Sequence, residues 1–267
     1  MNLSRVGAIV LRMYYLYRGS PQRVFPMFAW VAVDIVLWGF ITRYLNGVSQ
    51  SGFSFVPTLL GAVLLWDFLT RVMQGVTMAF FEDVWSRNFL NLFATPLTTT
   101  EYLLGLVTAS ILTSLVSLAF MMVLATSLFG LSFLTYGTAL APFLLVLFVS
   151  GMALGIFAAG LVLRLGPASE WLIWPIPTLI SPFAGVFYPV SVLPPWMGLI
   201  SKALPPSYVF EGMRAVVMHK AVSWNGLMIG GGLSVFYVVL ACLFFTSVYR
   251  YAIRTGLIAR YSAETVT

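Results

Sequence analysis

The sequence predicts an all-α integral membrane protein, and three observations carry this prediction. Hydrophobic residues make up 60% of the 267 residues and charged residues only 8%, so polar side chains are too few to cover a surface that faces water. Six nearly uncharged stretches are long enough to cross a bilayer as helices, which takes about 20 residues each. No repeat and no linker rich in Gly, Ser or charge divides the chain, so we expect residues 1–267 to form a single transmembrane domain.

The same composition excludes soluble enzymes, nucleic-acid-binding domains and secreted modules held together by disulfides. The net charge is +6, but in an integral membrane protein an excess of Lys and Arg usually reflects orientation. Cys242 is the single cysteine, so no disulfide can form within the chain. We therefore expect membrane lipid as a partner and no nucleic acid.

Residues 1–20 predict an interfacial helix ahead of the first span. Apolar residues alternate there with Arg5 and Arg12, which are seven apart and fall close together on a helix. This pattern suits a helix at the inner membrane surface, with both arginines at the interface. Pro21 and Pro26 favour a break before the first span. The alternative is a simple cytoplasmic extension of that span.

The six predicted spans place both termini on one side of the membrane. With the N-terminus inside, nine basic residues fall in cytoplasmic segments and four in outer segments, which favours cytoplasmic termini in a cytoplasmic (inner) membrane. The spans run roughly over Val24 to Ile41, Phe55 to Phe81, Tyr102 to Phe129, Tyr136 to Leu163, Trp171 to Pro189 and Asn225 to Tyr249.

Charges inside the first two spans predict a polar cluster. An unpaired charge at mid-bilayer costs roughly 3 kcal/mol or more. Asp67 and Arg71 are four apart, so they share a helix face and can pair. Asp34 lies at a matching depth in the first span if the two spans are antiparallel neighbours. We expect these three residues to cluster, either as a structural feature or as part of a translocation path.

The segment 82–95 between spans two and three predicts a short amphipathic helix. Aromatic and aliphatic side chains recur there at helical spacing with polar ones between them, and Pro96 stops the helix. Such a helix can float on the lipid headgroups or dock into a soluble partner through its aromatic side chains. Its apolar residues are Trp85, Phe89, Leu92 and Phe93.

Prolines set the stretch from Arg164 to Pro206 apart. Nine of the 14 prolines lie there, and each removes a backbone donor that lipid cannot replace. We therefore expect span five to be kinked or short. Broken, re-entrant half-helices near the outer face should follow over 191–220. An ordinary outer loop is the alternative.

Some kinds of chemistry are missing from the sequence. There is no G-x-x-x-x-G-K-[ST] phosphate loop. The only histidine is His219 and the only thiol is Cys242, so we expect no metal site. Serine-based catalysis lacks a base, and we do not expect an enzyme.

Several motifs together resemble the type-two ATP-binding-cassette (ABC) exporter permeases. They are Ala94-Thr95-Pro96-Leu97 leading to Glu101-Tyr102, Ser181 to Pro189, Leu193-Pro194-Pro195-Trp196, and Leu204 to Tyr208 with Glu211 and Arg214. Their order and spacing, with the six-span layout, make the resemblance fairly specific. The family's loop commonly carries a Gly-x-Leu-Glu element, where this chain has Asn88-Phe89-Leu90-Asn91.

The resemblance implies a membrane subunit that pairs with a second copy, as a homodimer, and with two separate ATPase subunits. ATP and magnesium would bind those ATPase subunits, and this chain would hold no cofactor. The segment 82–95 would be the coupling helix that docks the ATPase. Its docking residues would be Glu82, Asp83, Trp85, Arg87, Phe89, Leu92 and Phe93.

An exporter of this kind would move an amphiphilic solute, such as a lipid-linked saccharide or polysaccharide, a lipid or a hydrophobic drug. Flat apolar side chains can border such a path, although aromatic residues at membrane depth are more often packing or interface anchors. The outer segment around Pro194 to Tyr208 would form the exit gate. The candidate path residues are Trp30, Trp38, Trp66, Phe183, Phe187 and Tyr188.

Two other functions remain open from the sequence. An ion-coupled carrier would bind a proton at Asp34 or Asp67 and would keep transporting after ATP depletion. A membrane scaffold would transport nothing.

Overall fold

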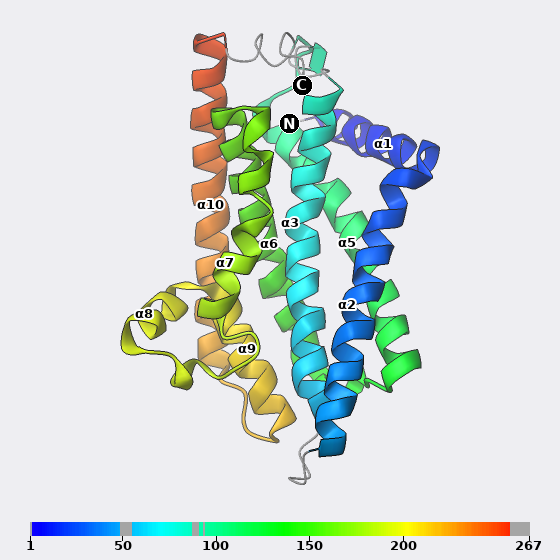
Figure 1. Cartoon of the computed structure of the whole chain (residues 1–267). Coiled ribbons are helices and arrows are strands. Elements are labelled where there is room, and N and C mark those ends of the chain that lie inside the picture. Colours follow the sequence, from blue (N-terminus) through cyan, green and yellow to red (C-terminus); the bar gives the residue numbers. More distant parts are fainter. Residues whose placement is uncertain (1, 49–54, 87–90, 93, 257–267) are drawn as a thin grey trace.

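Long helices run side by side in the computed structural model, and one helix, α1, lies across an end of the bundle (Figure 1). The structure describes residues 2–48, 55–86, 91–92 and 94–256. Within these ranges the chain is all-helical and contains no strand. The predicted fold class is therefore confirmed at the level of an all-α protein.

Five helices of the described chain are long and apolar enough to cross a membrane. They correspond to five of the six predicted spans, with ends shifted by several residues. They are α2 (Pro21–Val48), α3 (Gly61–Trp85) after the π-helical turn η1 (Val56–Leu60), α5 (Thr99–Phe129), α6 (Leu140–Leu165) after the 3-10 turn η2 (Phe133–Ala139), and α10 (Trp224–Arg254).

The predicted fifth span is not a single membrane-length helix. It consists of a 3-10 turn, η3 (Pro167–Leu172), and a 10-residue helix, α7 (Pro175–Ala184). At 1.5 Å per residue α7 is about 15 Å long, half of a bilayer core. α7 begins at Pro175. Proline is tolerated there because the N–H groups of the first turn have no partner within the helix. Gly185 then ends it in the left-handed conformation (φ 62°).

Short helices continue through the region where half-helices were predicted. The 3-10 turn η4 (Val190–Val192) is followed by α8 (Pro195–Ala203) and α9 (Pro205–Val217), and both α8 and α9 begin at proline. α6 ends near the end of the bundle where α1 lies, and α10 begins near the opposite end (Figure 1). The segment from α7 to α9 therefore carries the chain back along the bundle, while its depth in a membrane stays a prediction.

Small residues let α6 pack tightly between α3 and α10. A Cβ atom on Gly151 would lie 2.7 Å from the carbonyl oxygen of Leu69, and one on Gly155 would lie 2.8 Å from that of Met73. On the other side, the hydroxyls of Ser150 and Ser234 lie 2.9 Å apart and join α6 to α10. These glycines therefore serve a contact within the chain.

The N-terminal helix α1 (Leu3–Gly19) is separate from α2. The Asn2 side chain caps it by accepting a hydrogen bond from the Ser4 backbone N–H at 3.0 Å. Its buried face, Ile9 and Met13, packs on α5, where Gly105 leaves room for Ile9. The chain turns at Ser20 into α2 at a clear angle (Figure 1). This favours the separate helix over a simple extension of the first span.

Candidate functional site

The candidate site lies where α1 meets the connection between α3 and α5. Thr98 and Glu101 begin α5 with a reciprocal capping box. The Thr98 hydroxyl accepts from the Glu101 N–H at 3.2 Å, and the Glu101 carboxylate accepts from the Thr98 N–H at 3.0 Å. A carboxylate in this first turn is also favoured by the helix dipole.

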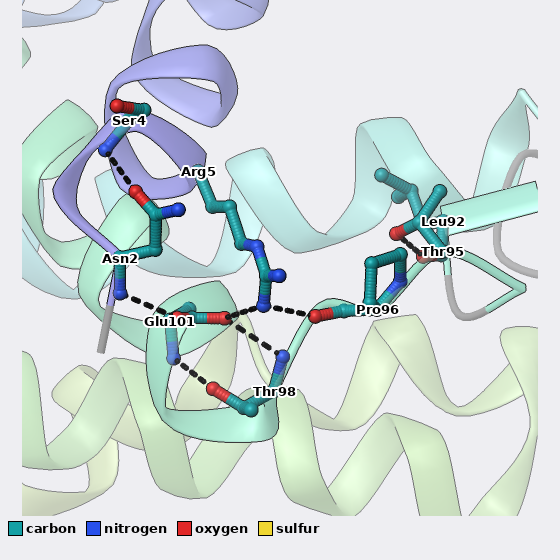
Figure 2. A network of polar contacts seen from close by, with 8 residues as sticks. All are labelled: Asn2, Ser4, Arg5, Leu92, Thr95, Pro96, Thr98 and Glu101. Atoms are coloured by element: carbon teal, nitrogen blue, oxygen red, sulfur yellow. Dashed lines mark hydrogen bonds and ion pairs between the residues drawn. The ribbon is translucent and has the colours of Figure 1, made fainter.

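The same Glu101 carboxylate holds the beginning of the chain (Figure 2). It accepts the Asn2 backbone N–H at 2.7 Å and pairs with the Arg5 guanidinium at 3.3 Å. Arg5 also donates to the carbonyl oxygen of Pro96. One side chain, buried to 2% exposure, thus joins the start of α1, the α3–α5 connection and the start of α5.

A second link is buried deeper. Arg12 of α1 forms an ion pair with Asp83 in the last turn of α3. Tyr102 of α5 donates its hydroxyl proton to the other oxygen of Asp83 at 2.7 Å. Because Asp83 is fully buried, its charge depends on these partners, and removing one would leave the others uncompensated.

A third link joins α2 to α3. Arg23 pairs with Glu82 at 3.2 Å, and this pair is more exposed than the other two, so it contributes less to stability. Burial, and then the Glu82 charge, raise the pKa of Tyr17, which keeps this tyrosine neutral. Three arginines from the N-terminal 23 residues are therefore held by three acids of α3 and α5.

These links give Arg5 and Arg12 a role within the chain that the sequence did not predict. Both were predicted at the inner membrane interface, which stays a prediction, and each also forms an ion pair with an acid within the chain. Sequence reasoning missed Glu101 as the counterpart of Arg5 and Asp83 as the counterpart of Arg12. The signal was present, since all three acids lie at the predicted cytoplasmic ends of spans two and three.

The four predicted docking residues that the structure describes do not share one surface. The segment expected as a helix over 82–95 begins inside α3, which continues to Trp85. Glu82 contacts Arg23, and Asp83 is buried, so Asp83 cannot touch a soluble partner. Trp85 is 45% exposed and stacks on Phe81 at 5.4 Å. Leu92 packs against the core. The remaining docking residues, Arg87, Phe89 and Phe93, lie outside the described residues.

The intramembrane charges come near one another without forming the expected ion pair. Asp34 of α2 and Arg71 of α3 both act electrostatically on Asp67. Within the described ranges, however, neither acid lies within 4.0 Å of Arg71, which donates instead to Gln74 at 3.0 Å. One oxygen of Asp67 and the Nε of Arg71 are buried without a hydrogen-bond partner. No salt bridge joins these three charges, and their action as a cluster stays a prediction.

The predicted path aromatics are only partly brought together. Trp38 of α2 stacks on Phe187 after α7, with ring centroids 4.9 Å apart. Trp66 packs near Phe210 of α9 at 6.0 Å. The other three are separate: Phe183 contacts Trp196 of α8, Tyr188 donates to the carbonyl oxygen of Pro182, and Trp30 is exposed on α2.

Glu211 and Arg214 fasten the segment after α7 to α9. They pair with each other at 2.8 Å. The Glu211 carboxylate also accepts the Val190 N–H at 2.8 Å, and Arg214 donates to the carbonyl oxygen of Val186. Both residues belong to the motifs of the sequence resemblance, and their contacts hold the turn that carries Phe187 against the bundle.

The fold and this site define a multi-pass helical membrane protein whose N-terminal helix is clamped to the connection between two spans. A family model for the ABC-2 type transporter matches residues 8–218. The chain belongs to this family, and it is a permease component of an ABC transporter. Membership implies pairing with a cytoplasmic ATP-binding subunit, where the ATPase activity lies. Comparison with curated proteins gave no match.

Proposed function

We propose that this chain is the membrane subunit of an ATP-driven exporter for an amphiphilic substrate. Two copies would pair in the cytoplasmic membrane and bind two ATPase subunits, with ATP and magnesium held by the ATPases. The substrate would be a lipid-linked saccharide or polysaccharide, a lipid or a hydrophobic drug. Both termini would face the cytoplasm.

One observation carries this proposal: the arginine–acid links between the N-terminal segment and the α3–α5 connection. Arg5 holds Pro96 and Glu101 together, and Arg12 holds the end of α3. A displacement of this connection by an ATPase would therefore move α1 with it, and through α1 the attached α2. Such linkage is what lets nucleotide state and pore conformation bias one another.

The distribution of positive charge supports cytoplasmic termini. α1, the C-terminal end of α6 and the C-terminal end of α10 lie at the same end of the bundle (Figure 1). These segments contain Arg18, Arg164 and Arg254 in their last turns. Basic residues next to membrane spans are enriched on the cytoplasmic side.

The outward face of α2 supports a seam between two copies. Its apolar side chains include the exposed Val33, Leu37 and Phe40. Together with Ala32, Val36, Ile41 and Tyr44 they form one open, mostly apolar face of this helix. An apolar face that one chain leaves uncovered suits either a second copy or an amphiphilic solute passing beside it.

Trp85 offers a direct test of ATPase docking. We expect Trp85→Asp to abolish co-purification of the ABC ATPase co-expressed with this chain, and to abolish ATP-dependent substrate uptake into inside-out vesicles. Trp224→Asp is the matched control, because Trp224 is 50% exposed against 45% for Trp85 and begins α10 at the other end of the bundle. Transport by the purified chain without any ATPase would contradict the proposal.

The unpaired oxygen of Asp67 supports the second candidate, an ion-coupled carrier. In that case Asp67→Asn would abolish transport, and transport by the unchanged chain would survive ATP depletion but collapse with the proton gradient. Under the exporter proposal, ATP depletion stops transport and a protonophore does not.

A further inference from the structure

We propose that a groove between α1, α2 and α5 binds one acyl chain of an anionic glycerophospholipid, with the lipid phosphate at Arg18. This lipid would be a resident part of the subunit and not the exported substrate. The inference needs only insertion into a membrane. It does not depend on the ATPase or on export.

The groove is large and apolar enough for hydrocarbon. Its volume is about 190 Å³, whereas an apolar cavity of about 150 Å³ holds benzene. Three helices line the groove. α1 contributes Val10, Tyr14 and Tyr17, α2 contributes Phe28, and α5 contributes Leu112 and Val116. Leu112 lies about 20 Å along α5 from Thr99, so the groove extends from α1 into the depth of the bilayer core.

The position of the groove identifies lipid as the occupant. Leu112 and Val116 are more than half exposed and lie in the middle of a helix that is apolar enough to cross the membrane. The surroundings at that depth are acyl chains, and a groove lined by apolar side chains cannot be filled favourably by water.

The charges around α1 identify the headgroup as anionic. Arg5, Arg12 and Arg23 are each neutralised by an acid of α3 or α5. Arg18 is exposed and makes no ion pair with any residue that the structure describes. It follows Tyr14 by one helical turn, so it lies beside the groove. A cation at that place attracts the phosphate of an anionic lipid.

Native mass spectrometry of the purified full-length chain tests this inference with two added lipids, dioleoylphosphatidylglycerol and dioleoylphosphatidylcholine. We expect one tightly retained lipid and a preference of about fivefold for phosphatidylglycerol, the effect of one cation near an anionic headgroup. Arg18→Gln should remove the preference, and Val116→Trp should remove the retained lipid by filling the groove. Arg43→Gln and Val235→Trp are the matched controls, since Arg43 is exposed at the other end of α2 and Val235 is exposed on α10.

Cross-linking provides a second measurement that does not need a variant. A phosphatidylglycerol carrying a diazirine in its acyl chain should label α1 and the middle of α5 after illumination. The inference would be overturned by equal retention in Val116→Trp, by equal binding of the two lipids to the unchanged chain, or by labelling confined to other helices. Cross-links at this groove between two copies of the chain would assign it to an interface instead.

Discussion

At the residue scale, the molecule depends on a few acids that each satisfy several donors. Asp83 forms an ion pair with Arg12 and accepts from Tyr102, and Glu101 accepts from Asn2, Arg5 and Thr98. Sequence reasoning assigned Asp83 to ATPase docking and gave Glu101 only as part of a motif, and it paired neither with an arginine. Which arginine meets which acid depends on the angle at which α1 crosses the bundle, and that angle is a property of tertiary packing.

Removing Asp83 tests the buried link. Asp83→Ala leaves the Arg12 charge without its counter-charge and removes the carboxylate to which Tyr102 donates, so we expect a loss of about 3 kcal/mol in the free energy of unfolding. Thermal unfolding in detergent measures it. The double variant Asp83→Ala with Arg12→Met should recover much of the loss, because it leaves no uncompensated charge. Equal stability of the two variants would contradict the pairing.

Replacing Glu101 separates charge from shape. Glu101→Gln keeps the side-chain length but loses the ion pair with Arg5, so we expect faster hydrogen–deuterium exchange in α1, and a weaker ATPase response to substrate in the assembled transporter. Thr98→Ala is the control, since it weakens only the capping box by about 1 kcal/mol and leaves Arg5 paired. Unchanged exchange in α1 after Glu101→Gln would refute the clamp.

Replacing Arg71 tests whether the three intramembrane charges act as a cluster. Arg71→Met leaves Asp34 and Asp67 as two acids without a nearby cation, and both must then take up protons to stay in an apolar setting. We expect lower expression and lower thermal stability, measured in detergent. If expression, stability and transport all stay normal, the three charges do not act as a cluster.

At the scale of elements, the length of the apolar stretches predicted five of the long helices. The proline content predicted that the sixth stretch would be broken. Five predicted spans lie in membrane-length helices. The stretch from Trp171 to Pro189 has suitable composition but forms η3 and α7, because its prolines occupy positions that begin or interrupt helices. Sequence could indicate a break there. It could not give the number of pieces or show that Glu211 and Arg214 fasten them.

The contact between α3 and α6 depends on glycine. A Cβ on Gly151 would approach the backbone of α3 to 2.7 Å, so Gly151→Ala should force the two helices apart and lower stability by about 1–3 kcal/mol. Gly232→Ala on α10 meets open space and should be neutral or slightly stabilising. Unfolding measurements on both variants distinguish a packing effect from a general effect of alanine.

At the scale of the whole molecule, membrane topology follows from how the region between α7 and α9 crosses the bilayer. If this region carries the chain back across the membrane, both termini lie on the same side. With only the five long helices as spans, the termini would lie on opposite sides. Labelling of single cysteines in a Cys242→Ser background tests this. We expect Asn2→Cys and Thr255→Cys to react only from the cytoplasm and Lys220→Cys only from outside. Labelling of Asn2 and Thr255 from opposite sides would contradict the proposed orientation.

The close approach of α3, α6 and α10 has a consequence for how an opening can form. Glycine and serine contacts hold these three helices close together. Closely packed side chains leave little free space, so the three helices resist sliding past one another. α2 buries few side chains, among them Val31 and Ile35, and turns most of its apolar surface outward. A tilt of α2 against these three helices would therefore cost little packing, and because α1 is attached to α2, the motion would start at the end of the bundle where α1 lies.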